Sequence, residues 1–316
     1  MDRTPTPLTP LRIGTRGSAL ALAQANETRD RLAEAHDLPT EAFEIVIIRT
    51  TGDRIIDRSL RELGGKGLFT REIEQALADG EIDIAVHSMK DMPTLQPEGL
   101  VIDCILPRED PRDAFVSDRY ESLAAMPAGA VVGTSSLRRR AQVAQRRPDL
   151  RIVEFRGNVQ TRLRKLADGL ADATFLAQAG LARLDQLEVA RGAVAPGEML
   201  PAVAQGAIGV ERRSADELVA ALLAAINHPP SALRVAAERA FLLRLDGSCE
   251  TPIAGLCEIE AGDRLWLRGE ILRPDGSEAV MGERRGGFAE AAAMGEDLAA
   301  ELLGRAGAGF FEFRCA

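Results

Sequence analysis

Short apolar segments alternate with amphipathic segments along the first two thirds of the chain. The apolar segments have the β-branched character of buried strands and cover residues 11–14, 44–50, 82–88, 130–133, 151–155 and 173–178. The amphipathic segments after them are expected to be helices, with N-caps at Ser18, at Thr70, within 134–136, and at Asn158 or Thr161. This alternation is typical of α/β units with mainly parallel sheets, and two such domains are expected.

The last third of the chain has a different pattern. Two helical segments come first, separated by Pro229 and Pro230, with Ser231 as the expected N-cap of the second. Three strand-like segments joined by Ala-Gly-Asp and Pro-Asp-Gly turns follow, and a helix is expected at about 289–304. We therefore expect an antiparallel meander within a smaller α+β domain.

Size and composition are those of a globular protein with a polar surface. The 316 residues suggest two or three domains at roughly 150 residues each. The net charge of −9 argues against a surface that binds nucleic acid or anionic lipid over its whole extent. The apolar runs fall short of the roughly 20 residues that cross a bilayer, and the first ten residues do not resemble an export signal. We expect a cytoplasmic protein without a membrane partner.

The four cysteines give no sign of a metal site or a disulfide framework, because they form no CxxC pair and lie far in sequence from the three histidines. Cys104 and Cys257 lie in apolar segments and are expected to pack in the core, whereas Cys315 lies in a terminal tail. Cys249 follows an Asp-Gly-Ser turn after a helix, so it is either a small buried side chain or an exposed, reactive thiol.

Positive charge is concentrated in residues 138–165, which contain ten Arg or Lys and two acidic residues. One interpretation is a solvated helix face. Two features favour anion binding instead: Arg138 and Arg139 follow a Gly-Thr-Ser-Ser turn at an expected helix N-terminus, and Arg156 directly follows an expected strand. Since arginine suits carboxylate and phosphate recognition, we expect a polyanionic ligand.

Aromatic content distinguishes the two main kinds of polyanion. The chain has one Tyr, one Trp and ten Phe, and only Phe155 lies in the basic window, so few side chains could stack on bases. We favour a small ligand with several carboxylates and expect no nucleic-acid partner.

Two further segments carry candidate chemistry. Gly64–Gly67 lacks the spacing of a phosphate loop, and it is either a surface loop or a lid that carries Lys66 over a cleft. Lys90 and Asp91 follow an apolar strand, where they form either an exposed ion pair or part of a site. A carboxylate at a strand end in an arginine-lined cleft could stabilise a cation or transfer a proton, so Asp91 is the catalytic candidate.

Together these stretches resemble the porphobilinogen deaminase (hydroxymethylbilane synthase) family. The resemblance extends from about residue 11 to 285, and its motifs occur in one order: IGTRGSALALAQ, GGKGLFTREIE, DIAVHSMKDMPT, EDPRDAFVS, VVGTSSLRRRAQ, RRPDL, FRGNVQTRL, LPAVAQGAIGVE, ALRVAAERAFLLRLDGSCETPI and PDGS.

The resemblance implies two α/β domains similar to type II periplasmic binding proteins, with mainly parallel sheets and a cleft between them, and a smaller C-terminal α+β domain. The expected boundaries are 1–106 with 204–225, 107–203, and 226–316. It also implies a monomeric transferase of tetrapyrrole biosynthesis that joins four porphobilinogen units to a dipyrromethane primer. The enzyme would then release hydroxymethylbilane by hydrolysis, with ammonia as the other product.

The resemblance also implies roles for individual residues. Cys249 would hold the dipyrromethane cofactor through a thioether, and Asp91 would bind pyrrole N–H groups, stabilise the cation left by ammonia and help to move protons. Further cofactor contacts would come from Ser18, Ser88, Lys90, Thr134, Ser136, Arg138 and Arg139. Substrate contacts would come from Arg16, Lys66, Phe69, Arg156, Arg162, Arg183 and Gln205.

Three positions depart from the family pattern: Glu62 and Ala182 stand where Lys occurs in other members, and Gln160 stands where Gly is frequent. These departures weaken carboxylate binding only at the periphery of the site.

Two other classes of function remain as alternatives. One is a non-catalytic binding protein of the periplasmic type, against which the Cys249 loop and the lack of an export signal argue. The other is a nucleic-acid binder that uses residues 138–165, for which steep salt dependence of binding would be the sign.

Overall fold

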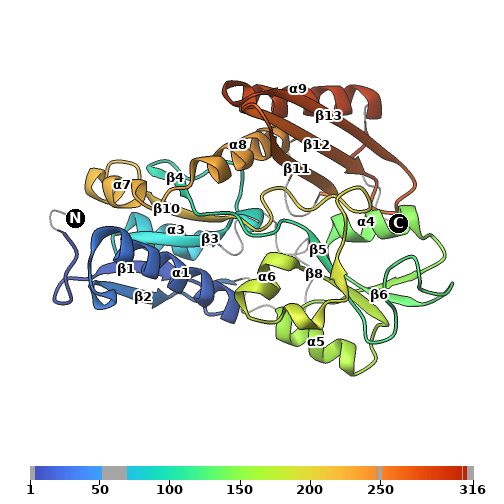
Figure 1. The fold of residues 1–316 in the computed structure, drawn as a ribbon, viewed down its shortest axis with the longest axis horizontal. Coiled ribbons are helices and arrows are strands. Elements are labelled where there is room, and N and C mark those ends of the chain that lie inside the picture. Colours follow the sequence, from blue (N-terminus) through green and yellow to red (C-terminus); the bar gives the residue numbers. More distant parts are fainter. Residues whose placement is uncertain (1–3, 52–69, 246, 248–250, 308, 312–316) are drawn as a thin grey trace. The chain divides into compact units, whose positions relative to one another are not determined.

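The computed structural model describes residues 4–51, 70–245, 247, 251–307 and 309–311 (Figure 1). The chain forms two compact units, each of which contains two separate stretches of sequence. Unit 1 comprises residues 1–108 and 207–232, and unit 2 comprises residues 109–206 and 233–316.

Unit 1 is built on a five-stranded sheet in the order β2-β1-β3-β10-β4. Strands β2, β1 and β3 are parallel, and β10 pairs antiparallel with both β3 and β4. Four of the five strands therefore run in one direction, and the reversed strand β10 comes from the later stretch of sequence. The elements of this unit are β1 (Leu11–Thr15), α1 (Ala19–His36), β2 (Phe43–Ile47), α3 (Arg71–Ala78), β3 (Ile84–Ser88), β4 (Leu100–Ile105), β10 (Ile208–Arg213) and α7 (Glu217–Ala224).

Helix α1 begins directly after β1, and Figure 1 shows it beside β1 and β3. The Ser18 hydroxyl accepts a hydrogen bond from the Ala21 amide at 3.2 Å, which fixes the first turn as the sequence predicts. One side of the sheet packs on α1 and α7 through a core that includes Ile13, Leu32 and Val210. The Ser18 cap and this core together fix the turn between β1 and α1 relative to the sheet.

Unit 2 contains a second five-stranded sheet with the same arrangement, in the order β7-β6-β8-β5-β9. Here β5 is the reversed strand, in the fourth position that β10 occupies in unit 1. The elements around this sheet are β5 (Asp113–Val116), β6 (Val131–Gly133), α4 (Leu137–Arg146), β7 (Arg151–Val153), α5 (Val159–Ala167), β8 (Ala173–Ala177), α6 (Gln178–Arg183) and β9 (Gly192–Ala193).

A three-stranded antiparallel sheet completes unit 2, with two helices on one face (Figure 1). Phe241 of α8 and Leu298 of α9 both pack against Gly269 on that face. The buried Glu238 carboxylate of α8 accepts hydrogen bonds from the amides of Ala204 and Cys257, at 2.6 and 2.8 Å. The elements are α8 (Pro229–Arg244), β11 (Ile253–Glu260), β12 (Arg264–Leu272), β13 (Ala279–Gly287) and α9 (Ala291–Ala306).

These sheets confirm the predicted fold class of two α/β arrangements with mainly parallel strands and a smaller α+β part. One local prediction was wrong. Helix α8 begins at Pro229, so both prolines and Ser231 lie in its first turn, where proline loses no helical hydrogen bond. The Ser231 hydroxyl instead accepts a hydrogen bond from the Arg108 amide. Thr70 precedes α3 as expected, but its side chain makes no capping hydrogen bond.

Gly206 packs closely against the backbone of Glu109 in unit 2, and this contact can be tested by substitution. Its φ is +87°, and an added Cβ would lie 2.6 Å from the Glu109 carbonyl oxygen. Gly169 has a similar φ of +73° with nothing within 4 Å, so it is a matched control. We expect Gly169→Ala to cost about 1 kcal/mol from backbone strain, and Gly206→Ala to cost roughly 1–3 kcal/mol more from the clash. Equal shifts in the thermal midpoints of the two variants would contradict this packing.

None of the described helices alone has the length and apolarity to cross a membrane; α7 and α8 pass that test only as a pair bent by 111°. Within the same residues, no group of three or more His, Cys, Asp or Glu side chains is arranged to hold a metal ion.

Candidate active site

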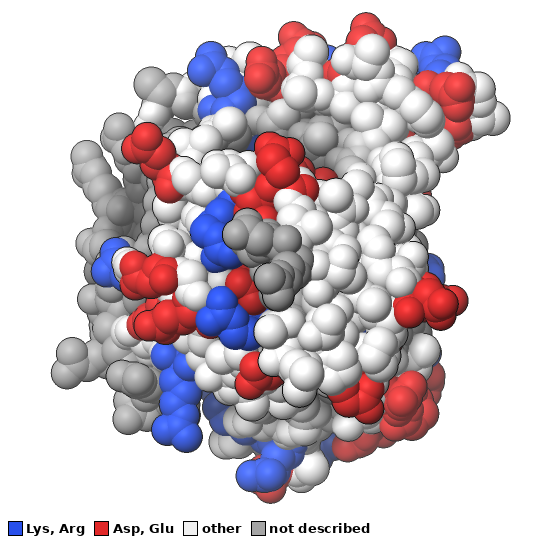
Figure 2. Space-filling model, turned by 90° about the vertical axis from the view of Figure 1, so that its left-hand side faces the viewer, with Lys and Arg blue, Asp and Glu red and all other residues white. Residues whose placement is uncertain are grey.

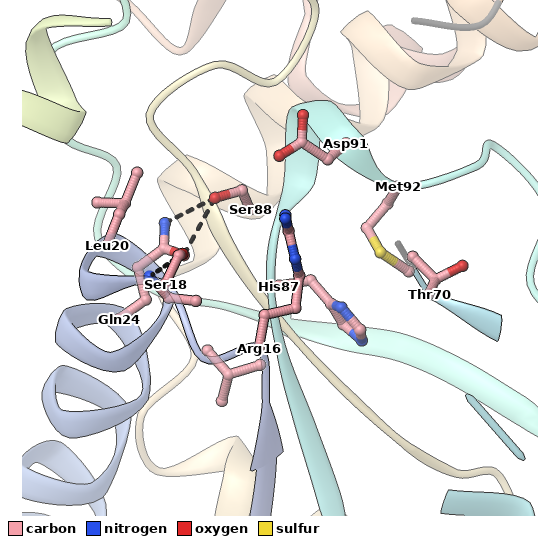
Figure 3. A pocket seen from close by; sticks show the side chains of 11 residues that line it. Arg16, Ser18, Leu20, Gln24, Thr70, His87, Ser88, Asp91 and Met92 are labelled. Atoms are coloured by element: carbon pink, nitrogen blue, oxygen red, sulfur yellow. Dashed lines mark hydrogen bonds between the residues drawn. The ribbon is translucent and has the colours of Figure 1, made fainter. Parts of the chain in front are cut away.

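A pocket in unit 1 opens where β1 and β3 end and α1 begins (Figure 3). Because β1 and β3 are parallel, the loops after both strands leave the same edge of the sheet. This edge brings together residues that are up to 76 positions apart. The polar side chains around the pocket include Arg16, Ser18, Gln24, His87, Ser88 and Asp91.

The floor of this pocket is held by hydrogen bonds between α1 and β3. The Ser88 hydroxyl lies 2.8 Å from Nε2 and 3.0 Å from Oε1 of the Gln24 amide, which is 5% exposed (Figure 3). Asp91 lies in a short 3₁₀ helix, Met89–Asp91, directly after β3, and it is exposed. The pocket therefore combines the solvent-accessible carboxylate of Asp91 with the hydrogen-bonded side chains of Ser88 and Gln24.

A second cluster lies in unit 2, where two buried arginines share one carboxylate. Arg138 Nη1 lies 2.8 Å from Asp113 Oδ2, and Arg139 Nη2 lies 2.7 Å from Asp113 Oδ1. Gln205 Nε2 donates to the same Oδ1 atom at 2.9 Å. All four residues are at most 4% exposed. The solvated-face interpretation of the basic window is therefore wrong for Arg138 and Arg139.

The charge of this cluster is not balanced by Asp113 alone. Burial by itself would raise the pKa of Asp113, but the two guanidinium charges outweigh burial and hold that pKa well below its usual value. The carboxylate is ionised, and it neutralises one of the two arginines. The Nε atoms of both arginines are buried and have no hydrogen-bond partner within the described residues. Two buried N–H donors without a partner, on two neighbouring guanidinium groups, suit an anionic group.

Helix α4, which carries both arginines, is fixed at its other side by a buried glutamate. Glu270 of β12 is fully buried and accepts a hydrogen bond from Gln142 Nε2 at 2.6 Å. Arg146 Nη2 reaches the other oxygen of Glu270 at 3.3 Å. At the start of the helix, the Ser136 hydroxyl accepts from the Arg139 amide at 3.4 Å. The helix and its arginines are thereby fixed relative to the three-stranded sheet of unit 2.

The other predicted residues fall into three groups. Lys90 is half-buried beside Asp91, and the buried Thr134 lies at the end of β6. Three half-buried arginines lie in unit 2: one after β7, one within α5 and one at the end of α6, namely Arg156, Arg162 and Arg183. Three predicted residues lie outside the described residues: Lys66, Phe69 and Cys249.

Several other cationic side chains of residues 138–165 make ion pairs and backbone hydrogen bonds within unit 2. Arg147 pairs with Asp149 at 2.7 Å and donates to backbone carbonyls, and the Lys165 ammonium donates to the Arg156 carbonyl. On the face shown in Figure 2, the described Lys and Arg side chains are interspersed with Asp and Glu. This face therefore carries charges of both signs.

The expectation that Cys104 and Cys257 are packing residues is confirmed. Both are at most 1% exposed, and burial raises the pKa of the Cys104 thiol to about 12. A thiol with such a pKa is inert at neutral pH.

Sequence reasoning missed Asp113, Gln24 and Glu270 as site residues. Asp113 belongs to the EDPRD stretch, but its neighbours Asp110 and Glu109 are also acidic, and no local pattern shows which carboxylate is buried. The available signal was the strand-like AFV that follows Asp113, since a carboxylate that begins a buried strand requires a cationic partner.

The fold and the two clusters define a class of protein: an α/β protein with two mainly parallel sheets, a polar pocket at the end of one sheet and a buried arginine pair in unit 2. Comparison with known families identifies it further. Residues 11–221 match the porphobilinogen deaminase dipyrromethane-cofactor-binding domain, and residues 232–304 match the porphobilinogen deaminase C-terminal domain.

Curated relatives match over nearly the full chain. A porphobilinogen deaminase from Paracoccus denitrificans is 71% identical over 99% of this chain and 100% of its own length. A chloroplastic porphobilinogen deaminase from Pisum sativum is 53% identical over 95% of this chain and 83% of its own length. A solved periplasmic substrate-binding protein from Coxiella burnetii is 16% identical, with a TM-score of 0.40 over 72% of this chain and 96% of that one.

The chain belongs to the porphobilinogen deaminase family. It is an enzyme of tetrapyrrole synthesis that polymerises porphobilinogen, and its cofactor is dipyrromethane.

Proposed function

We propose that the enzyme joins four porphobilinogen units to a dipyrromethane primer linked through a thioether to Cys249, and then releases hydroxymethylbilane by hydrolysis. Each added unit loses its amino group as ammonia. The arginine pair clamped by Asp113 carries this proposal. Each pyrrole of the primer bears an acetate and a propionate, and the buried, unused Nε–H donors of Arg138 and Arg139 fit such carboxylates.

Asp91 is the proposed catalytic residue. Its exposed carboxylate can accept hydrogen bonds from pyrrole N–H groups and stabilise the cation formed as ammonia leaves the substrate. It can also accept or return a proton during turnover.

Carboxylates on the cofactor and on the growing chain would be held by hydroxyl, amide and cationic side chains of both units. In unit 1 these are Arg16, Ser18, Lys66, Ser88 and Lys90, with Phe69 as a further substrate contact. In unit 2 they are Thr134, Ser136, Arg138, Arg139, Arg156, Arg162, Arg183 and Gln205. For Gln205, the bond to Asp113 supports a role in holding the arginine pair.

The proposed organisation has three domains, with boundaries at 1–106 with 204–225, 107–203, and 226–316. The separate three-stranded sheet and the distinct C-terminal family match at 232–304 support the third of these. We also propose that the enzyme acts as a cytoplasmic monomer without nucleic-acid or membrane partners. The net charge and the mixed charge of the face in Figure 2 support the exclusion of nucleic acid.

Intact-protein mass spectrometry tests the cofactor anchor directly. Freshly expressed wild type is expected to carry an added mass of two linked pyrrole units, and Cys249→Ser is expected to lack it. Cys257→Ala is the matched control, because the Cys257 thiol is fully buried in β11, and this variant should retain the added mass. If Cys249→Ser kept the full added mass, the cofactor would be attached to a residue other than Cys249. An unmodified wild type, even after incubation with porphobilinogen, would contradict the proposed primer.

A further inference from the structure

Buried polar contacts lead from the three-stranded sheet of unit 2 to the arginine pair. Glu270 of β12 accepts a hydrogen bond from Gln142 Nε2 at 2.6 Å, and Gln142 Oε1 accepts one from Arg138 Nη1 at 2.9 Å. Arg138 Nη1 also lies 2.8 Å from Asp113 Oδ2. Glu270, Gln142 and Asp113 are fully buried, and Arg138 is 4% exposed. A continuous path therefore joins β12 to the carboxylate that pairs with both arginines.

The two-residue period of β12 directs Glu270 toward α4. Gly269 lies on the face that the helices cover, where Leu298 of α9 packs against it. Because successive side chains of a strand lie on opposite faces, Glu270 lies on the other face. There one carboxylate oxygen bonds Gln142 and the other lies 3.3 Å from Arg146 Nη2. Both oxygens of this buried carboxylate thus contact side chains of α4.

The turn between β12 and β13 makes a second close contact with the same helix. Gly276, in the PDGS stretch, has a φ of +74°, and an added Cβ would lie 2.5 Å from the Gln145 backbone nitrogen. Both the positive φ and the close approach favour glycine there. The backbone of α4 is thereby held by the turn, and the direction of the Arg138 side chain depends on its own hydrogen bonds.

These hydrogen bonds fix the plane of the Arg138 guanidinium. Its Nη1 atom donates to Gln142 Oε1 and to the Leu200 carbonyl oxygen, at 2.9 and 2.8 Å. A guanidinium is planar, so two anchors at Nη1 also set the direction of the buried Nε–H, which has no partner among the described residues. Burial lowers the pKa of Arg138, and the carboxylates of Asp113 and Glu270 oppose this lowering.

We propose that Glu270 and Gln142 are positioning residues for cofactor binding, which direct the Nε–H of Arg138 to a carboxylate of dipyrromethane. Glu270 can only accept and Arg138 can only donate, so the Gln142 amide between them has one orientation. The inference rests on the proposed role of Arg138 as a cofactor contact. The three-stranded sheet, whose first strand begins four residues after Cys249, would then serve carboxylate binding as well as covalent attachment.

The rate of cofactor loading tests this inference. The full chain is expressed in cells that make no porphobilinogen, so that it is isolated without cofactor, and its intact mass is followed after porphobilinogen is added. We expect Glu270→Leu to load about tenfold more slowly than wild type, the scale of one hydrogen bond to a charged group. Glu270→Gln should lose less, because its amide oxygen can still accept from Gln142.

A double variant tests whether Glu270 acts through Gln142. Gln142→Leu removes the middle of the path and should load as slowly as Glu270→Leu. The combination of both changes should load no more slowly than either alone, since each interrupts the same path. If Glu270→Leu does not fold, Gln142→Leu and Glu270→Gln decide the question.

Leu298→Ala is the matched control for loss of stability. It removes a fully buried side chain from the helix-covered face of the same sheet and does not touch the path. We expect a lower thermal midpoint and wild-type loading. Fluorescence of Trp266, the one tryptophan of the chain, reports on β12 itself, because its ring centre lies 3.9 Å from the Arg268 guanidinium carbon. Native emission in each variant shows that the strand is folded.

Wild-type loading in folded Glu270→Leu and Gln142→Leu would overturn the proposal, as would equally slow loading in Leu298→Ala. Arg138→Lys, measured in parallel, separates this inference from the proposed function. Slow loading in Arg138→Lys beside normal loading in the other variants would overturn only the positioning roles. Normal loading in Arg138→Lys would overturn the cofactor contact of Arg138 itself.

Discussion

Replacing Asp113 with alanine is expected to lower the free energy of unfolding by roughly 3–5 kcal/mol, because two buried guanidinium groups lose their shared carboxylate. The loss should be larger than that of a single ion pair, since Arg138 and Arg139 would then repel one another at close range. The released side chains would no longer direct their Nε–H donors to a ligand carboxylate. We therefore expect Asp113→Ala to be isolated with little or no dipyrromethane, which intact-mass measurement shows directly.

The matched control for this variant is Asp110→Ala, three residues earlier. Asp110 pairs with Arg112 at 2.6 Å, but both side chains are partly exposed, and such pairs contribute about 0–1 kcal/mol. Asp113→Asn keeps the side-chain volume and removes only the charge, so it should lie between alanine and wild type. If Asp113→Ala had the thermal midpoint of the wild type and bound its full complement of cofactor, the arginine pair would not depend on this carboxylate.

The pH dependence of this effect follows from the lowered pKa of Asp113. The guanidinium charges favour the ionised carboxylate in the folded state despite burial, which acts in the opposite direction. Because the pKa of Asp113 is lower in the folded than in the unfolded state, its ionised carboxylate stabilises the fold at pH values above the unfolded pKa of about 3.9. This stabilisation is lost as the pH falls through the pKa of the folded state. The difference in stability between wild type and Asp113→Ala should thus be constant above about pH 5 and shrink only in stronger acid.

Replacing Asp91 with asparagine is expected to reduce kcat by roughly 10²–10⁴-fold while the fold and the cofactor stay intact. The change is nearly isosteric and the side chain is exposed, so packing is not disturbed. What is lost is the negative charge that stabilises the cation and the oxygen that accepts a proton. Ammonia release from porphobilinogen measures the rate, and intact mass verifies that the cofactor is still bound.

Asp79→Asn is the control for Asp91→Asn. Asp79 is an exposed carboxylate of the same unit at the end of α3, it bonds the Gln75 side chain, and it does not line the pocket. Its variant should turn over at the wild-type rate. If cofactor-loaded Asp91→Asn does so too, the pocket needs another source of negative charge and Asp91 loses its catalytic role.

The sequence by itself determined the local structure and the chemical character of the ligand. Alternating strand and helix patterns predicted most of the parallel strands. Ser18 marked where α1 begins, and the hydroxyl-bearing residues 134–136 marked where α4 begins, with Ser136 as the N-cap in the structure. These signals are local, because a capping hydroxyl or an apolar face is defined within one or two helical turns. The density of arginine predicted a polyanion, since carboxylate recognition depends on residue type as well as on position.

Only the tertiary structure decided how those arginines are held and which carboxylate pairs with the buried His87. The reversed strands β5 and β10 were not predicted; β5 supplies Asp113 to the arginine pair, and β10 supplies Glu211 to His87. In sequence, Asp113 lies 26 residues from Arg139 and His87 lies 124 residues from Glu211. Pairing over such separations depends on sheet order and register, which no local pattern contains. Because these groups are buried, each charge requires its partner, since an unpaired charge inside a protein is strongly destabilising. The same pairs at the surface would contribute little.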